Sequence, residues 1–361
     1  MAEPNEPPST LPLSPPPWLS SIAEDVEKRL ERLFQAETKR WSAVDSELEL
    51  AFKRLSELTL AGGKRLRPAF CHWGFVGAGG NPSESILTDV GAAFELLHAF
   101  ALIHDDVMDG SQYRRGLHTI HQQYATEHGL KQWKGESRRF GEGVAILIGD
   151  LAFVYADTLM AGTDKAVKSL YDEMRIEINI GQYLDLLGSA QSKISVTSTR
   201  RISLYKSAKY TIERPLHIGA GLNGRFDELA ESYSAYGLPL GEAFQLRDDV
   251  LGAFGNSNST GKPVGDDLIE GKPTLLLALA REQASSADVK LLGRVGANDI
   301  SGKEVEKIQE ILISTGALGK VEALITSLTD QAVGAIQNAP IEKDARMALI
   351  EIAPFVSWRD R

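Results

Sequence analysis

Apolar residues recur every three or four positions along most of the chain, which predicts helices rather than strands. Between residues 22 and 34, Ile22, Val26, Leu30 and Leu33 form one stripe, and charged residues fill most other positions. The same spacing predicts further helices over residues 44–60, 84–108, 143–160, 165–187, 197–221, 228–254, 272–283 and 303–336. No convincing run alternates in the way that a half-buried strand requires. The pattern indicates an all-α protein built as a single large helical bundle.

Glycine and proline residues separate these stretches and predict loops at about residues 110–142 and 255–272. Residues 1–17 contain seven prolines and almost no large apolar side chains, which predicts a disordered tail. We therefore expect one folded domain over residues 18–361. The charged segment 131–142 suggests no particular function.

The composition narrows the class of protein. The chain has 361 residues and a formal net charge of −10, so neither nucleic acid nor an anionic membrane surface is an expected partner. Its one cysteine, Cys71, permits no internal disulfide and suits a reducing, cytoplasmic location. The richest apolar stretch, Val144–Gly149, is ended by Asp150, well short of the roughly 20 apolar residues of a membrane span. No membrane span is expected.

Two acidic clusters are the strongest candidates for chemistry. Asp105, Asp106 and Asp109 follow a long apolar stretch, and Asp105 and Asp109 share one helix face about 5–6 Å apart. Such carboxylates repel one another unless a cation lies among them, and Mg²⁺ prefers oxygen ligands beside a phosphate. Asp248 and Asp249 end a second apolar stretch. Two inward-facing clusters on facing helices are how a bundle builds a multi-metal site, although either cluster alone also fits a solvated helix end.

Basic residues gather before and between these clusters. Lys64, Arg65 and Arg67 follow two glycines, where they can surround a polyanion or form a solvated turn. Arg114 and Arg115 come five and six residues after Asp109. Further polar candidates are spread over the second half of the chain: Gln182, Asp185, Lys206, Ser207, Lys262 and Lys272.

The order of these motifs resembles that of the trans-type isoprenyl diphosphate synthases. Gly-Gly-Lys-Arg-Leu-Arg-Pro comes first, then Asp-Asp-x-x-Asp with Arg-Arg-Gly, then Gly-Gln-x-x-Asp-Leu, then Gln-x-x-Asp-Asp. The resemblance extends from about residue 30 to residue 336. It implies an all-helical bundle around a deep central cavity, the isoprenoid synthase fold, in a homodimer.

The resemblance also implies roles for individual residues. Mg²⁺ ions on an allylic diphosphate would be held by Asp105, Asp106, Asp109, Asp248 and Asp249. The rest of that diphosphate pocket would comprise Arg114, Lys206, Ser207, Gln245, Lys262 and Lys272. The site for isopentenyl diphosphate would comprise Lys64, Arg67, His98 and Arg115. Catalysis would depend on Lys206, Gln245 and Arg114. The second acidic motif departs from the full pattern, because Gly252 stands where a last aspartate would be.

The expected reaction follows from the charges. Metal ions and cations stabilise the departing pyrophosphate, and the double bond of isopentenyl diphosphate attacks the allylic cation that remains. Lys206 and Gln245 would stabilise that cation. Loss of a proton, with pyrophosphate as the base, completes the cycle.

Product length is expected to depend on the helix before the first motif. Ala101 lies one turn before Asp105 on nearly the same face, and its small side chain leaves room for a growing tail. Phe100 points about 140° away from Asp105 on an ideal helix, so spacing alone leaves open how far it blocks the path. An aromatic residue there, with no insertion in the motif, resembles the geranylgeranyl diphosphate synthases. We expect a twenty-carbon product, with farnesyl or longer products as alternatives.

Two rival classes fit less of the sequence. A terpene cyclase would lack the basic motif at residues 62–68, and the nearest match to its second metal motif, at Asn298, has its serine one position early. A non-catalytic regulatory subunit of a heteromeric synthase would be expected to lose one acidic motif, whereas both are present.

Overall fold

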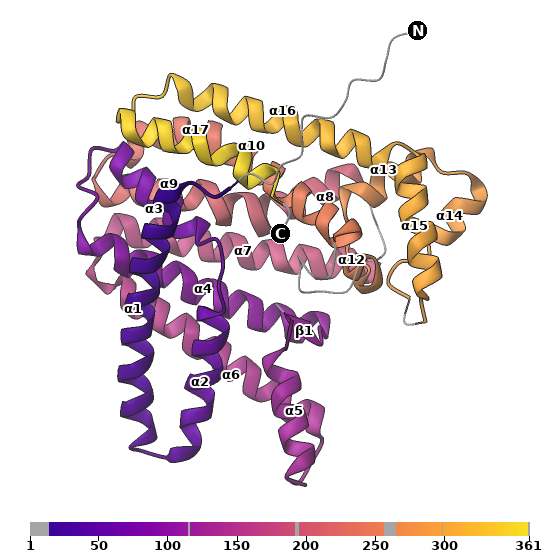
Figure 1. Ribbon diagram of the computed structural model, residues 1–361, viewed down its shortest axis with the longest axis horizontal. Helices are drawn as coiled ribbons and strands as arrows, with labels where there is room; N and C mark the ends of the chain where they lie inside the picture. The colour runs from indigo at the N-terminus through magenta and orange to yellow at the C-terminus, as the bar shows by residue number, and fades with distance from the viewer. Residues whose placement is uncertain (1–13, 115, 192–194, 256–264, 298, 360–361) are drawn as a thin grey trace.

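Helices dominate the computed structural model, which describes residues 14–114, 116–191, 195–255, 265–297 and 299–359 (Figure 1). The first half contains α1 (Pro17–Ser42), η1 (Ser46–Leu48), α2 (Glu49–Leu60), α3 (Leu66–Gly77), α4 (Ser85–Asp109), α5 (Ile120–Leu130), α6 (Ser137–Leu159), η2 (Met160–Gly162) and α7 (Lys165–Gln191). The second half contains α8 (Val196–Ser203), η3 (Leu204–Glu213), α9 (Arg214–Leu222), α10 (Phe226–Phe254), α12 (Asp266–Glu270), α13 (Leu275–Gln283), α14 (Ser286–Leu292), α15 (Gly302–Ser314), α16 (Ala317–Gln337) and α17 (Lys343–Ser357). The two short strands of the described residues, β1 (Tyr113–Arg114) and β2 (Leu117–His118), form an antiparallel pair. The prediction of an all-α bundle is confirmed.

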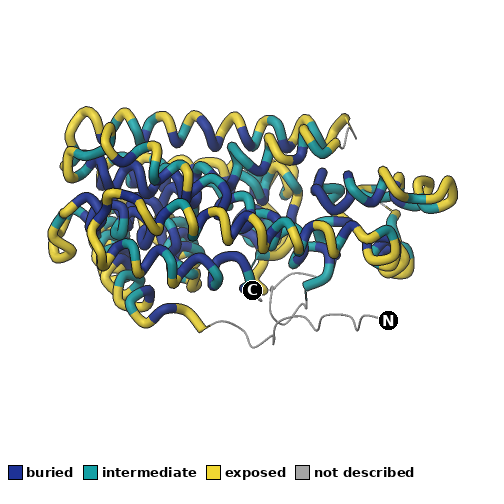
Figure 2. Tube along the Cα trace, turned by 90° about the horizontal axis from the view of Figure 1, so that it is seen from above, coloured by how far each residue is buried: buried dark blue, intermediate teal, exposed yellow. Residues whose placement is uncertain are grey.

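Helix α4 lies in the middle of the bundle, in contact with α1, α3 and α6. Phe94, Leu96 and Leu97 on this helix have no exposed surface. Buried faces turn inward along the bundle and exposed faces turn outward (Figure 2). This burial holds the end of α4, and therefore Asp105, at a defined place inside the molecule.

A ten-residue π-helix, η3, continues α8 and leads into α9. Its backbone is packed tightly on both sides: a Cβ at Gly181 of α7 would lie 2.4 Å from the Lys206 nitrogen, and one at Gly241 of α10 would lie 2.4 Å from the Ala208 Cα. Only glycine allows so close an approach. The π-helix is therefore fixed between α7 and α10, and π-helical turns occur often at functional sites.

Several expected elements differ from the structure. The expected loop at 110–142 contains β1, β2, α5 and the start of α6, because the apolar residues of α5 are not confined to one face. Helix α3 was not expected, since nine of its twelve residues are buried and it has no polar face to give a periodic pattern. The stretch 303–336 is two helices, interrupted at Gly316, whose φ is +73°.

Further differences lie near the ends of the chain and in the second expected loop. The spacing of apolar residues did not predict helices α14 and α17. The second expected loop, at 255–272, contains the short helix α12. Of the expected tail, residues 1–13 lie outside the described residues, and Pro17 already belongs to α1.

Two helices are long and apolar enough to cross a membrane by length and composition: Ser85–Asp109 and Ser137–Gly162, each with a mean hydropathy of 1.7 in its most apolar window. The bent pair of α15 and α16 would make a third if it is one span. The expectation that no membrane span is present rested on uninterrupted apolar runs. Length and composition do not support it, because isolated polar residues such as Glu95 and His98 hardly lower the mean hydropathy of a window. In α4, however, 61% of the window is buried inside the protein.

Candidate active site

A cavity of about 1320 Å³ brings both acidic clusters and the first basic cluster together. Its lining includes Asp105 from α4, Lys206 and Ser207 from η3, and Gln245 and Asp248 from α10. Lys64, Arg67 and His98 line the same cavity. Segments more than a hundred residues apart thus face one space, as the motifs predicted.

The three aspartates of α4 have different surroundings. Asp105 accepts hydrogen bonds from Gln182 Nε2 at 2.8 Å and from Lys206 Nζ at 3.2 Å. Burial opposes its ionisation, but Lys206 and Arg114 lower the pKa of Asp105 to about 2. Asp106 is buried and pairs with Arg114, whose Nε lies 2.7 Å from its Oδ1. Asp105 is therefore a carboxylate at neutral pH that presents its charge to the cavity.

Asp109 completes the first motif one turn later. Burial and the neighbouring charge of Asp105 raise the pKa of Asp109 to about 7. A carboxyl group with such a pKa is ready to ionise fully when a cation arrives.

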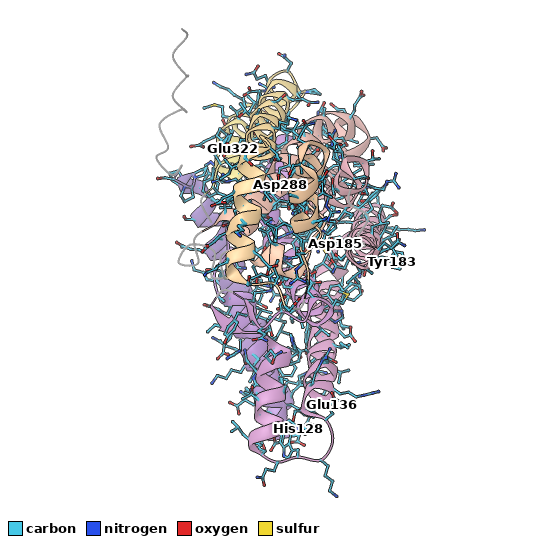
Figure 3. All side chains as sticks on the ribbon, turned by 90° about the vertical axis from the view of Figure 1, so that its right-hand side faces the viewer. His128, Glu136, Tyr183, Asp185, Asp288 and Glu322 are labelled. Carbon is cyan, nitrogen blue, oxygen red and sulfur yellow. The ribbon has the colours of Figure 1, made fainter. Side chains whose placement is uncertain are left out.

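Lys206 links the first motif to α7. Its ammonium group lies 2.6 Å from Asp185 Oδ2 as well as 3.2 Å from Asp105. Burial lowers the pKa of Lys206, but the two carboxylates outweigh burial and raise it. The side chain therefore stays charged at the wall of the cavity. Figure 3 shows Asp185 inside the molecule, whereas Tyr183 on the same helix lies at its outer edge.

The second motif is held by a short chain of hydrogen bonds. Ser207 Oγ donates to Gln245 Oε1, and Gln245 Nε2 donates to Asp249 Oδ1 at 2.7 Å. Burial raises the pKa of Asp249 to about 8, and the nearby Asp267 and Asp248 act in the same direction. Hydrogen bonds therefore fix both polar atoms of the Gln245 amide. Burial and the neighbouring carboxylates disfavour the charged form of Asp249.

Asp248 is oriented by a residue that sequence reasoning missed. The guanidinium group of Arg359 donates to Asp248 Oδ1 and to the Phe244 carbonyl oxygen and stacks on the Phe244 ring at 3.8 Å. In return, Arg247 Nε donates to the Arg359 carbonyl oxygen at 2.7 Å. No motif in the sequence singles out Arg359.

Asp267 occupies the space beside Gly252, where the second motif lacks an aspartate. A Cβ at Gly252 would lie only 1.8 Å from Asp267 Oδ2. Lys272 Nζ is 3.1 Å from Asp267 Oδ1 and 2.7 Å from Glu270 Oε2. The carboxylate that α10 lacks is thus supplied by α12. In the sequence, this carboxylate was signalled by the pair Asp266-Asp267, which follows Gly252 along the chain.

The basic motif divides into two parts. Arg65 points into the core, where it pairs with Glu95 and Glu27 and donates to the Thr59 carbonyl oxygen at 2.9 Å. Its φ of +47° is left-handed, which is strained for a residue other than glycine. Lys64, Arg65 and Arg67 all border the cavity, but the charge of Arg65 is already paired with Glu95 and Glu27.

Arg67 is placed by the π-helix. Its Nη2 lies 3.2 Å from Thr211 Oγ1, and its guanidinium group lies 4.2 Å from the centre of the Tyr210 ring. His98 is near the same ring, at 6.4 Å. Lys64, Arg67 and His98 therefore form a cationic and polar wall of the cavity.

The remaining predicted residues differ in whether they line the cavity. Arg114 and Lys272 are not among the described lining residues. Arg114 pairs with Asp105, which lines the cavity, whereas Lys272 pairs with Asp267 and Glu270, which are not among the lining residues either. Arg115 and Lys262 lie outside the described residues. Phe100 and Ala101 both line the cavity.

The donor set fits Mg²⁺ bound together with a diphosphate. Among the described residues, no three His, Cys, Asp or Glu groups are close enough to enclose a metal by themselves. Mg²⁺ in proteins is commonly held by one or two carboxylates together with substrate phosphates and water. Burial, and after it the neighbouring carboxylates, raise the pKa values of Asp109 and Asp249, and a bound cation would favour their charged forms.

The fold is a helical bundle, and its cavity combines carboxylates with cationic side chains, an arrangement that suits polyanionic ligands with bound metal ions. Residues 49–312 match the family model of the polyprenyl synthetases. A short chain isoprenyl diphosphate synthase of Methanothermobacter thermautotrophicus is 32% identical over 89% of this chain and 94% of its own. The octaprenyl diphosphate synthase of Escherichia coli is 29% identical over 88% of this chain and 93% of its own.

A solved structure gives the same result. The geranylgeranyl pyrophosphate synthase of Corynebacterium glutamicum, complexed with isoprenyl diphosphate and magnesium, superimposes with a TM-score of 0.89. It is 34% identical, over 94% of this chain and 99% of its own. The chain belongs to the polyprenyl synthetase family and is a prenyltransferase.

Proposed function

We propose that this protein condenses isopentenyl diphosphate with an allylic diphosphate, with Mg²⁺, to give geranylgeranyl diphosphate. The observation that carries this proposal is that one cavity is lined by residues of both acidic motifs and of the basic motif. Asp105, Lys206 and Asp248 line it and would form one wall, and Lys64, Arg67 and His98 line it and would form the other. Two diphosphates bound at these walls would bring their hydrocarbon parts together between them.

The carboxylates would hold the metal on the allylic diphosphate. Asp105, Asp109 and Asp248 are the candidate ligands, with Asp106, Asp249 and Asp267 behind them. Bound Mg²⁺ would stabilise the negative charge of the diphosphate as it leaves. Lys206 adds a fixed positive charge beside Asp105, where it contributes to the same stabilisation.

The protein also has to stabilise the allylic cation. The Gln245 amide oxygen faces Ser207, and its amide nitrogen faces Asp249, so its dipole is fixed before the substrate binds. A fixed dipole stabilises developing charge without reorganisation. The condensed product then loses a proton, for which the departing pyrophosphate is the nearest strong base.

The second diphosphate would bind at the other wall. Arg67 offers a forked guanidinium group and Lys64 a compact ammonium group, and both suit phosphate oxygens. The buried pair of Arg65 and Glu95 holds the turn that presents them. The substrate needs no metal at this wall, since its diphosphate does not leave.

Ala101 and Phe100 support the twenty-carbon product. Both side chains line the cavity, where the small Ala101 would leave space for the growing tail and the large Phe100 would restrict it. The test is to incubate the purified chain with Mg²⁺, isopentenyl diphosphate and dimethylallyl, geranyl or farnesyl diphosphate, and to read chain lengths by mass spectrometry. We expect a twenty-carbon product from all three primers. Absence of elongation with every primer would refute the proposal.

We also propose a cytoplasmic homodimer. Helices α6 and α7 carry large apolar side chains that remain exposed in the single chain: Leu147 at 64%, Val154 at 57%, Ile176 at 54% and Tyr183 at 66%. Exposed apolar surface of this kind marks association sites. Sedimentation of the wild type and of Leu147→Glu with Tyr183→Glu tests this: the wild type should be a dimer and the double variant a monomer.

A further inference from the structure

The ring of Phe100 is held between two other rings. Its centre lies 4.5 Å from that of His104 and 4.8 Å from that of Phe153. Phe100 and His104 are four residues apart on α4 and line the cavity, whereas Phe153 of α6 is not among the described lining residues. Phe153 therefore backs Phe100 on the side away from the cavity.

Helix α6 also fixes the His104 ring. Ile146, Gly149 and Phe153 follow the i, i+3, i+7 spacing of one helix face. The His104 Nε2 lies 3.1 Å from the Ile146 carbonyl oxygen, and a Cβ at Gly149 would lie 2.4 Å from the imidazole ring. The imidazole is thus seated directly on Gly149, and Phe100 cannot turn toward it.

Phe153 is itself held from behind. The Arg175 guanidinium group of α7 lies 4.9 Å from the centre of the Phe153 ring, and its Nη1 lies 3.1 Å from Asp157 Oδ1. Arg175, Phe153, Phe100 and His104 therefore form one continuous row. Rings in such tilted contacts are stabilised beyond their simple burial, which favours a single rotamer for Phe100.

We propose that Phe153 determines product length through Phe100. By occupying the space behind Phe100, Phe153 keeps that ring as a wall of the cavity beside Ala101. Without it, the ring of Phe100 turns toward α6 and the cavity lengthens. Phe153 is thus a positioning residue for chain-length specificity, an inference that rests on the proposed elongation activity.

The test is a double-mutant comparison of product lengths from farnesyl and isopentenyl diphosphates. In Phe153→Ala, the ratio of longer products to the twenty-carbon product should rise about tenfold, the scale on which a pocket discriminates one small apolar group. Phe100→Ala should lengthen products at least as much. The double variant Phe100→Ala with Phe153→Ala should match Phe100→Ala alone, because Phe153 acts only through Phe100.

Phe140→Ala is the matched control. Phe140 lies on the same helix, is also partly buried, and packs on Trp133 and His128 instead of α4. It should leave product length unchanged. If Phe153→Ala does not fold, Phe153→Leu should still lengthen products to a smaller extent.

Three results would overturn the inference: wild-type products from a folded Phe153 variant while Phe100→Ala lengthens them, additive effects in the double variant, or equal lengthening by Phe140→Ala. Failure of the wild-type chain to elongate any primer would instead refute the proposed function.

Discussion

The two acidic clusters of the cavity differ in how their charge is compensated. Asp105 on α4 meets Lys206 and Gln182, and its pKa is lowered to about 2. Asp249 on α10 accepts a hydrogen bond from the Gln245 amide and is buried near other carboxylates, and its pKa is raised to about 8. Asp105 is therefore charged before any metal arrives, whereas Asp109 of the first cluster and Asp249 of the second become fully charged when one binds.

This difference separates two tasks. A carboxylate already paired with Lys206 forms a fixed reference point for the metal and the diphosphate. A carboxyl group with a raised pKa couples metal binding to release of a proton, because metal ligands must be deprotonated. Four predictions test this division.

Loss of the fixed carboxylate should have the largest effect. Asp105→Asn removes the charge that faces the cavity and leaves Lys206 with one carboxylate instead of two, so we expect kcat to fall by about a thousandfold. Steady-state kinetics at saturating Mg²⁺ measures this change. Asp330→Asn, on the exposed side of α16, is the control and should change kcat less than about twofold. A similar small effect for Asp105→Asn would show that the first cluster is not the reference point.

Moving a carboxylate within the second cluster should have an intermediate effect. Asp267→Asn should weaken binding of Mg²⁺ with pyrophosphate by about tenfold to a hundredfold, as for other residues behind metal ligands. Gly252→Asp alone should destabilise the protein, since its Cβ would meet Asp267 at 1.8 Å. The double variant Gly252→Asp with Asp267→Gly moves the carboxylate to α10. Its affinity for Mg²⁺ with pyrophosphate, measured by calorimetry, should be higher than that of Asp267→Gly alone. No difference between the double variant and Asp267→Gly alone would argue against a shared role.

The pH dependence of metal binding should come from Asp109 and Asp249 and not from Asp105. Asp109 and Asp249 have pKa values of about 7 and about 8, so affinity for Mg²⁺ with pyrophosphate should fall as pH decreases below 8, by up to about tenfold per unit for each proton released. For the same reason, the metal-free protein should become less stable as pH rises from 6 to 8.5, because groups with raised pKa values stabilise the fold only while protonated. Thermal unfolding in EDTA measures this. The carboxylate of Asp105 contributes no change in that window, since its pKa is far below it.

Arg359→Gln should have the smallest effect on catalysis. Asp248 keeps its charge but loses its orienting guanidinium group, so the apparent affinity for Mg²⁺ should fall by about threefold. The apparent Mg²⁺ affinity of Arg359→Lys should lie between those of the wild type and Arg359→Gln, because an ammonium group keeps the positive charge but not the forked donor geometry of arginine. Mg²⁺ titration of all three proteins distinguishes this role from a purely structural one, which would lower the melting temperature without changing the metal dependence.

The sequence predicted the parts of the site that depend on local spacing. The helical bundle, the carboxylates on one face of α4 and the cavity wall formed by Lys64 and Arg67 all follow from periodicity and motif order. The positions of Asp267 and Arg359 depend instead on how α12 and the end of α17 pack against α10. Spacing along one helix cannot reveal such contacts. The inward direction of Arg65 was also hidden, since it depends on a left-handed turn and on Glu95, thirty residues away.

The π-helix at Leu204–Glu213 has a consequence for how this region tolerates genetic change. One extra residue per turn distinguishes a π-turn from an α-turn, so its register is sensitive to chain length. Deletion of one residue after Ser203 would restore α-helical winding and rotate Lys206 and Ser207 by about 100° relative to the preceding helix. Substitutions at exposed positions here should be tolerated, whereas single-residue insertions and deletions should not. We therefore expect selection in this segment to act on the helical register of the backbone as well as on the side chains.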